Sequence, residues 1–446
     1  MRLRSILLTG AVALGTTQVN AQNWVEDTVT MGPGYANDVF YSLKNGSVKT
    51  EPNMTWHLAF QTTPQGPYGN VSVFANQVQG GVQIYPLHMS ANTHFATLSA
   101  ADTVGKTAMD QQQFNSDSTW NLGAFNKMND PADPFDFSWG QYNMGTHDVL
   151  GDSLYLVTVT NGPTTEAYKI WIQRYDSSPA DSVHWEFRIA KFDGTEDTLI
   201  KIYRKPAFED RLFAYYNVET QTVSDREPGR STWDLLFTRY KEFMPGAPGV
   251  PYYSVMGVLA NFDVTVAEMQ HVAADDTVGY VGYSYVSKMN EIGSDWKTFD
   301  NTTMQWSFED STYYFVKTKN TNEYYQLHFT GFGGAGTGKA MFKKRFLGIY
   351  DPMDVATVNT PLNAFKIAPN PAGNNVSLMI DAKEQMKDAQ VMITDLTGKV
   401  VFRANANMNS GLTALNVNTA SFASGTYVVV LTGGTWKVTE KLIVQH

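Results

Sequence analysis

The hexapeptide TWHLAF at residues 55–60 recurs as TWDLLF at residues 232–237, with its tryptophan 177 residues further on (233 − 56). Six other short matches occur, in the same order in both copies. Their separations begin at 175 (216 − 41) and fall to 157 (325 − 168), because the first copy spends extra residues between 105 and 139. Chance matches would scatter, so this order indicates an internal repeat. We expect two copies of one domain, at residues 22–204 and 205–350.

Within both copies, apolar and polar residues alternate over short runs separated by Gly, Pro, Asn and Asp. Examples are NVSVF at 70–74, LYLVTV at 154–159 and AYKIWI at 167–172. Alternation with a period of two is typical of half-buried β-strands, and the separating residues favour turns. The expected fold class is therefore all-β, with two tandem antiparallel domains. Only the segments around 96–109 and 264–274 could hold a short helix.

A third domain is expected after a proline-bracketed linker at 351–362. Residues 363–446 contain about seven alternating runs, and the sequence DLTGK at 395–399 has the glycine of a hairpin turn. This many strands in so short a segment predicts a small Ig-like β-sandwich.

The last domain also carries a recognisable set of motifs. They are Pro369-Asn370-Pro371, Asp395-Leu396-Thr397-Gly398-Lys399, Leu415-Asn416-Val417, Ser424-Gly425-Thr426-Tyr427 and the closing run Lys441-Leu442-Ile443-Val444. The set resembles the type A C-terminal sorting domain of the type IX secretion system. The resemblance implies a Gram-negative, Bacteroidetes-type host and recognition of residues 363–446 by the secretion translocon and its sortase. The mature protein would be released or attached to surface lipopolysaccharide.

The N-terminus is consistent with export. Arg2 and Arg4 precede a short apolar run at 6–14, and Val19-Asn20-Ala21 is a plausible cleavage site, so residues 1–21 are expected to be a signal peptide. The apolar run is too short to cross a membrane, and no other segment is long enough. Localisation is therefore expected to be secreted or on the outer-membrane surface, reached through the periplasm.

Composition limits the function classes. The net charge is -10, which argues against nucleic-acid binding because an acidic surface repels phosphate backbones. The chain has no cysteine, so disulfides, thiol catalysis and thiolate metal sites are excluded. We find no serine-hydrolase elbow and no zinc-protease motif. The sequence GGAGTGKA at 333–340 lacks the Ser or Thr of a phosphate-binding loop and is interpreted as a hairpin loop. The chain is not expected to be an enzyme.

The repeated tryptophan strands also resemble the HmuY-like family of secreted β-proteins, which includes haem-binding haemophores. The resemblance rests on residues 56–60 and 233–237, each followed by a Gly-Val strand start, at 81–82 and 257–258. It implies a ligand-binding protein with haem as one possible ligand.

An axial haem ligand is usually His or Met beside an apolar pocket. The candidates are His88, Met89, Met269 and His271. The ordinary alternative is that these are surface histidines and gap-filling methionines. A structural or adhesive surface protein without a small-molecule ligand remains the second hypothesis.

Overall fold

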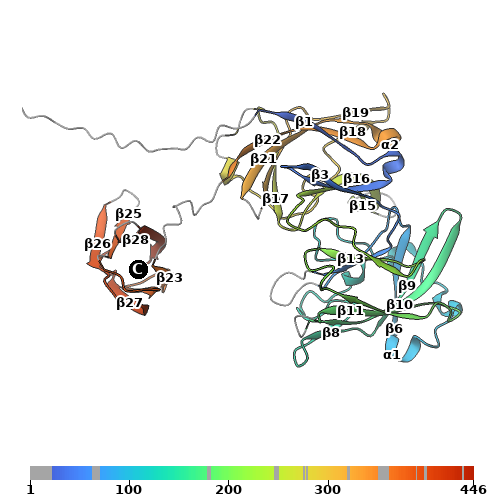
Figure 1. The fold of residues 1–446 in the computed structure, drawn as a ribbon, viewed down its shortest axis with the longest axis horizontal. Coiled ribbons are helices and arrows are strands. Elements are labelled where there is room, and N and C mark those ends of the chain that lie inside the picture. The colour runs from blue at the N-terminus through green and yellow to red at the C-terminus, as the bar shows by residue number, and fades with distance from the viewer. Residues whose placement is uncertain are drawn as a thin grey trace, which may run out of the picture. The chain divides into compact units, whose positions relative to one another are not determined.

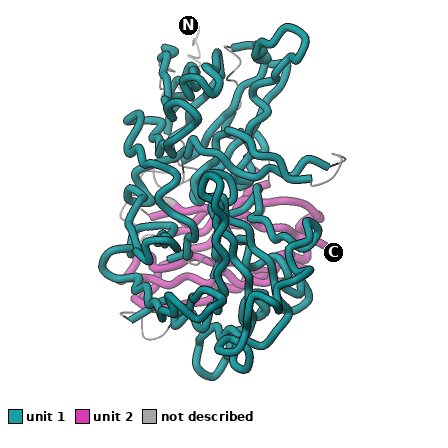
Figure 2. Tube along the Cα trace, turned by 90° about the vertical axis from the view of Figure 1, so that its right-hand side faces the viewer, with its two compact units in different colours: residues 1–349 teal, residues 350–446 magenta. Residues whose placement is uncertain are grey.

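The computed structural model describes residues 23–62, 71–177, 182–245, 251–274, 277, 280–318, 322–349, 361–387, 389–395, 399–433 and 436–446. The expected signal peptide and most of the expected linker lie outside these residues. The chain divides into two compact units, residues 1–349 and 350–446 (Figure 2). Strands in antiparallel sheets are the main regular structure of both units, so the prediction of an all-β fold is confirmed.

The first unit contains two lobes, which Figure 1 shows one above the other. In the first lobe, the outer sheet begins with the strand order β12-β11-β10 and then branches at β10. One branch continues through β8 to β7, and the other continues through β9 to β6. An inner sheet has the order β14-β13-β4-β5. The strands are β4 (Leu58–Gln61), β5 (Val73–Ala75), β6 (Val82–Ser90), β7 (Gln141–Asn143), β8 (Asp148–Leu150), β9 (Ser153–Asn161), β10 (Thr164–Asp176), β11 (His184–Lys191), β12 (Thr198–Tyr203), β13 (Phe213–Asn217) and β14 (Thr222–Ser224).

The second lobe repeats this plan. Its outer sheet has the order β1-β22-β21-β20-β17 and its inner sheet the order β16-β15-β2-β3. The strands are β1 (Val25–Thr30), β2 (Asn37–Ser42), β3 (Gly46–Pro52), β15 (Leu235–Phe243), β16 (Tyr252–Ala260), β17 (Val264–Met269), β20 (Tyr313–Thr318), β21 (Glu323–Phe332) and β22 (Lys339–Ile349), with a separate hairpin of β18 (Thr298–Asp300) and β19 (Gln305–Ser307). Each lobe encloses its own apolar core between the two sheets.

The two lobes are not contiguous halves of the chain. β1 pairs with β22 and β2 pairs with β15, so the N-terminal segment 25–52 completes the second lobe. Conversely, β13 pairs with β4 in the first lobe. The division at 204/205 stays a prediction about the sequence repeat, because the packed lobes consist of residues 58–224 and of residues 25–52 together with 235–349. The matched tripeptides at 41–43 and 216–218 thus fall on strands that were exchanged between the lobes.

Two details differ from expectation. Residues 264–269, considered for a helix, form strand β17 because alternate residues Val264 and Val266 enter the second core. The Gly-Val pairs at 81–82 and 257–258 are not equivalent: Val82 begins outer strand β6, whereas Val258 lies inside inner strand β16. Helices are short, with α1 at Ala91–His94 and α2 at Gly334–Thr337, and α2 lies in the glycine-rich loop that joins the antiparallel strands β21 and β22.

The second unit is a two-sheet sandwich with its own core. Its described strands are β23 (Leu362–Ala368), β24 (Asn375–Ala382), β25 (Gln390–Asp395), β26 (Val400–Asn405), β27 (Gly411–Asn418), β28 (Gly425–Gly433) and β29 (Trp436–Val444). They form the sheets β23-β24-β27 and β26-β25-β28-β29. Asn370 accounts for one sorting motif, because its side chain donates to the Lys441 carbonyl at 2.7 Å and accepts from the Ile443 amide at 2.8 Å. These hydrogen bonds connect the loop after β23 to the last strand, β29.

Candidate binding cleft between the two lobes

The inner sheets of the two lobes are apolar on both faces. In β13, Ala214 and Tyr216 enter the first core while Phe213 and Tyr215 point the other way, toward the second lobe. In β2, Val39 and Tyr41 enter the second core, and Phe40 points toward the first lobe. Because successive strand residues face opposite sides, this pattern places a separate apolar cluster between the lobes. The lobes therefore pack sheet against sheet.

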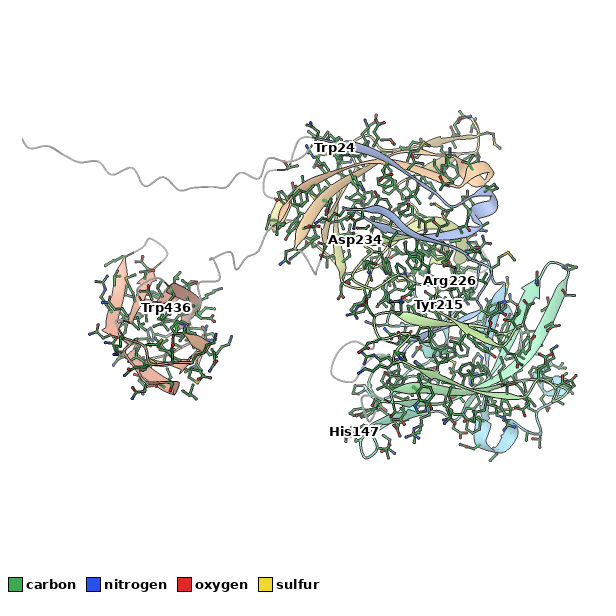
Figure 3. The ribbon with its side chains drawn as sticks, viewed as in Figure 1. Trp24, His147, Tyr215, Arg226, Asp234 and Trp436 are labelled. Atoms are coloured by element: carbon green, nitrogen blue, oxygen red, sulfur yellow. The ribbon has the colours of Figure 1, made fainter. Side chains whose placement is uncertain are left out.

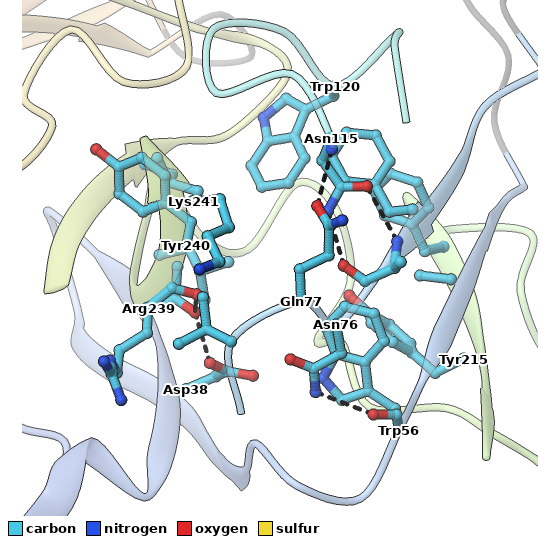
Figure 4. Close-up of a pocket in the computed structure, with 18 of the residues that line it drawn as sticks. Asp38, Trp56, Asn76, Gln77, Asn115, Trp120, Tyr215, Arg239, Tyr240 and Lys241 are labelled. Carbon is cyan, nitrogen blue, oxygen red and sulfur yellow. Dashed lines mark hydrogen bonds between the residues drawn. The ribbon is translucent and has the colours of Figure 1, made fainter. Parts of the chain in front are cut away.

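A cleft opens within this interface, with an empty volume of about 700 Å³ including the part open to solvent (Figure 4). Aromatic rings form much of its wall. Trp56 packs edge-on against Tyr215, with ring centroids 5.0 Å apart, and Phe74 contacts Phe213 at 5.3 Å. Trp120 reaches the second lobe, because its Nε1 donates to the Ala260 carbonyl at 2.8 Å. Rigid aromatic walls of this kind are typical of small-molecule sites.

A buried ion pair joins the lobes beside the cleft. Arg226 and Asp38 are only 3% and 5% exposed, and Arg226 Nη2 lies 3.2 Å from Asp38 Oδ2. Arg226 also donates to the Pro52 carbonyl, and Thr238 donates to Asp38 Oδ1 at 2.7 Å. Burial raises the pKa of Asp38, and the guanidinium of Arg226 opposes that shift. Figure 3 shows Arg226 and Tyr215 where the two lobes meet. The two charges cancel, and the pair serves as a link.

The neighbouring residue, Glu227, is also buried. It accepts hydrogen bonds from the Leu212 amide at 2.7 Å and from the Tyr215 hydroxyl at 2.6 Å. Burial raises its pKa to about 7, although these hydrogen bonds act in the opposite direction. The carboxyl therefore changes protonation near neutral pH.

The amides on the cleft wall are committed to the protein itself. Asn76 donates to the carbonyls of Asn53 and Trp56, and Gln77 accepts from the Asn115 amide at 2.9 Å. Asn115 in turn bonds both the amide and the carbonyl of Ala75, as a neighbouring strand would. These side chains hold the wall in place and have little capacity left for a ligand.

Two cations differ from the other polar groups. Arg239 and Lys241 are half-buried on β15 and line the cleft, and neither has a carboxylate partner among the described residues. Among the described residues, Arg239 donates to Gln79 at a long 3.4 Å, its guanidinium lies 5.6 Å from the centroid of the Tyr35 ring, and its Nε is buried without an acceptor. Burial lowers the pKa of Lys241, and the positive charge of Arg239 lowers it further. In Figure 4, Lys241 lies on the β15 side of the cleft, and the guanidinium of Arg239 points outward from it. The cleft thus carries uncompensated positive charge.

The four residues predicted as haem ligands do not line this cleft. His88 is exposed and Met89 half-buried on β6 of the first lobe. Met269 is half-buried on β17, and His271 follows it, exposed, in the second lobe. Within each pair, the His and the Met are close in sequence. The two pairs lie in separate lobes. Among the described residues that line the cleft, one is a Met and none is a His. This residue is Met289, which is buried.

Sequence reasoning missed Arg239, Lys241 and Trp120. All three lie in segments whose partner surface comes from the other lobe. His57, on the repeated tryptophan segment, is 3% exposed, and its Nδ1 accepts a hydrogen bond from the Val218 amide at 2.9 Å. Asp234, at the matching position, accepts from the Leu43 amide at 2.7 Å. The two residues perform the same backbone-binding task in their lobes.

Comparison with known proteins identifies the second unit. Residues 366–445 match the family described as the secretion system C-terminal sorting domain. This match indicates export by the type IX secretion system, interaction with its machinery, and a secreted or cell-surface location. No helix among the described residues is long and apolar enough to cross a membrane.

No curated protein matches the sequence. Among solved structures, dimeric latent PorU from Porphyromonas gingivalis aligns over 67% of this chain and 26% of its own at 10% identity, with a TM-score of 0.15. The BSP domain of a biofilm associated protein aligns over 96% of this chain and 67% of its own, also at 10% identity and a TM-score of 0.15. Such TM-scores are too low to establish a shared fold.

Proposed function

We propose that this chain is a type IX cargo, led into the periplasm by the signal peptide at 1–21, whose interlobe cleft binds a small amphipathic anion outside the cell. The ligand would have a flat apolar body and an acidic group such as a carboxylate. The observation that carries the proposal is the pair of cations without carboxylate partners, Arg239 and Lys241, at the edge of an aromatic cleft.

The physical argument concerns charge balance. Burial, followed by the positive charge of Arg239, lowers the pKa of Lys241, because removal from water and a nearby like charge both disfavour the protonated form. The Arg226–Asp38 pair adds no net charge to the cleft. A bound anion would neutralise Lys241 directly and reduce the potential of Arg239, while its apolar body replaces water against the rings of Trp56 and Trp120. This combination favours binding rather than catalysis, and we propose no enzymatic activity.

The HmuY-like assignment and haem binding are narrower versions of the same idea. Haem is a flat apolar ring with two carboxylates, so its chemistry suits the cleft walls, but iron would find only Met289 there. Ligation by His88, Met89, Met269 and His271 stays a prediction. Titration of the mature chain with haemin decides it: a Soret band that shifts when those four residues are substituted supports haem, and a spectrum of free haemin removes it.

The anion site is tested with a fluorescent aromatic sulfonate, anilinonaphthalene sulfonate, and its uncharged analogue phenylnaphthylamine. We expect the sulfonate to bind the mature chain more tightly. Lys241→Gln should weaken that binding by about tenfold, since truncating one partner of a partly buried charge contact is costly, and Arg239→Gln should weaken it less.

The matched control is Lys339→Gln, an exposed lysine on β22, which should leave the dissociation constant unchanged. Equal binding of the charged and neutral dyes, or no effect of Lys241→Gln, would contradict the proposal. The alternative of an adhesive or structural surface protein, attached to lipopolysaccharide after export, predicts that neither dye binds specifically.

A further inference from the structure

The second lobe has a pocket of its own, beside its apolar core. The pocket has an empty volume of about 610 Å³ including its open part. Met256 and Phe332, which belong to the core, line it together with Tyr35 and Trp306, which pack against the core. Tyr35 stacks on Phe332 with ring centroids 6.0 Å apart, and Trp306 meets Phe332 edge-on at 4.9 Å. The pocket therefore has an aromatic wall that continues into the core.

Lys297 brings an amine into these apolar surroundings. The residue is only 9% exposed and lines the pocket. Its Nζ lies 5.0 Å from the centroid of the Phe332 ring and 5.9 Å from that of the Trp306 ring, and both rings line the pocket. A third ring, that of Trp296, has its centroid 4.2 Å from Nζ. The amine is thus surrounded by aromatic rings and adjoins the open space of the pocket.

The hydrogen bonds of this amine are those that an uncharged amine can make. Nζ of Lys297 donates to the Met256 carbonyl at 2.7 Å and to the Ser294 carbonyl at 3.1 Å. No carboxylate in the described part of the chain forms an ion pair with it. A neutral amine has two N–H groups and one lone pair. The two backbone carbonyls accept from both N–H groups and leave the lone pair free to react.

The carboxylates that face Lys297 act on it from a distance. Glu242 accepts hydrogen bonds from the hydroxyls of Ser294 at 2.5 Å and of Tyr240 at 2.8 Å, and Asp295 is exposed. Burial lowers the pKa of Lys297 to about 7, although the charges of Glu242 and Asp295 act in the opposite direction. A large share of this amine is therefore uncharged at neutral pH. A desolvated lysine of this kind is a nucleophile toward carbonyl compounds.

We propose that Lys297 captures an aromatic aldehyde in this pocket as a covalent Schiff base, with the ring of the ligand against Trp306 and Phe332. The lone pair of Nζ attacks the carbonyl carbon and forms a C–N bond. The carbonyl oxygen then leaves as water with the two amine hydrogens, and a C=N bond remains. The step needs no oxidant or reductant, and it is reversible, so it serves capture of a ligand. It does not depend on Arg239, which lines both this pocket and the interlobe cleft.

The test incubates the full mature chain with benzaldehyde and cyanoborohydride at pH 7. Cyanoborohydride reduces an imine to a stable secondary amine, and mass spectrometry of the peptides locates it. We expect labelling at Lys297 to be at least about tenfold faster than at Lys339, an exposed lysine on β22, because an amine with the ordinary pKa of about 10.4 is almost entirely protonated at pH 7. The rate at Lys297 should also saturate with benzaldehyde concentration, as binding in a pocket requires.

Two variants separate capture in the pocket from general reactivity. Lys297→Arg keeps hydrogen-bond donors for the two carbonyls but cannot form an imine, so the fast adduct in the intact mass should disappear. Trp306→Leu removes part of the aromatic wall and should slow labelling of Lys297 about fivefold, as expected for a lost aromatic contact. Labelling of Lys339 should be unchanged in both variants.

The parent chain alone can overturn the inference, whether or not either variant folds. Labelling of Lys297 no faster than that of Lys339 does so, and so does a rate at Lys297 that does not saturate. Unchanged labelling of Lys297 in a folded Trp306→Leu variant also contradicts it. The sulfonate titration reports on Lys241 and the interlobe cleft, so failure of either proposal leaves the other intact.

Discussion

Glu227 shows how the interlobe packing sets the chemistry of a single residue. The carboxyl is buried, and its partners are two backbone amides and the hydroxyl of Tyr215. Desolvation disfavours the charged form more than these hydrogen bonds favour it, so the pKa rises from 4.5 to about 7. The folded protein therefore holds a proton that the unfolded chain releases at lower pH.

This shift predicts a loss of stability as pH rises. The folded state binds more protons than the unfolded state between the two pKa values, so the contribution is complete below pH 4.5 and disappears as pH passes about 7. A shift of this size corresponds to about 3 kcal/mol. Glu227→Gln keeps a side-chain oxygen that can accept hydrogen bonds from the backbone amides, and it cannot ionise. The free energy of unfolding is measured by urea denaturation for both proteins. The difference, variant minus parent chain, should increase by about that amount between pH 4.5 and about pH 8.

The control for this experiment is Glu209→Gln, at an exposed carboxylate. It should leave the pH profile unchanged because exposed pairs contribute little. Other buried acids, such as Asp234 with a pKa raised by burial to about 6, act in the same direction but are present in both proteins and cancel in the difference. Parallel profiles for the parent chain and Glu227→Gln would mean that Glu227 ionises normally.

At this scale the sequence was a partial guide. The repeat indicated that His57 and Asp234 occupy matching positions. The structure shows one role, acceptance of a backbone N–H from the neighbouring strand, which either side chain can perform. Arg239 and Lys241 were not predicted, because an unpaired charge is defined by what lies across the interface.

At the scale of elements, the exchange of strands between the lobes is the main feature. β1, β2 and β3 leave the first sequence copy to complete the second lobe, and β13 and β14 complete the first. Period-two alternation predicted strands at 70–74, 154–159 and 167–172, which overlap β5, β9 and β10. The pairing of the exchanged strands could not be predicted, because similar copies present similar edges: β2 fits beside β15 by the same pattern that fits β13 beside β4.

The exchange predicts how fragments behave. A chain of residues 22–204 lacks β13 and β14 and leaves β1 and β2 without their partners β22 and β15, so it should not unfold cooperatively alone. Residues 205–446 lack β1–β3 and should also fail to form a stable second lobe. Co-expressed, the two fragments should copurify as an equimolar complex with the thermal transition of the intact first unit, because all described strands are then present.

The control fragment is residues 54–228, which contains every described strand of the first lobe. It should fold alone, with a cooperative thermal transition followed by circular dichroism. If residues 22–204 instead gave a stable monomer with a sharp transition, the strand exchange described here would be wrong.

At the scale of the whole molecule, the chain combines a two-lobed unit with a separately packed sorting domain. The sorting domain was predicted in position, strand content and family from its motifs, and the match to residues 366–445 confirms it. Local motifs suffice there because residues such as Asn370 bind the backbone within their own domain. The clefts of the first unit, by contrast, are assembled from distant segments, so no local pattern reveals them.

The central claim is that the last domain directs the rest of the chain out of the cell. It is tested most directly by comparing, in a bacterium with a type IX secretion system, the amounts of full-length chain and of a chain ending at residue 349 in the periplasm and outside the outer membrane. We predict that the full-length chain is found outside and that the shortened chain, still folded, accumulates in the periplasm. Equal delivery of both chains to the outside would contradict the account.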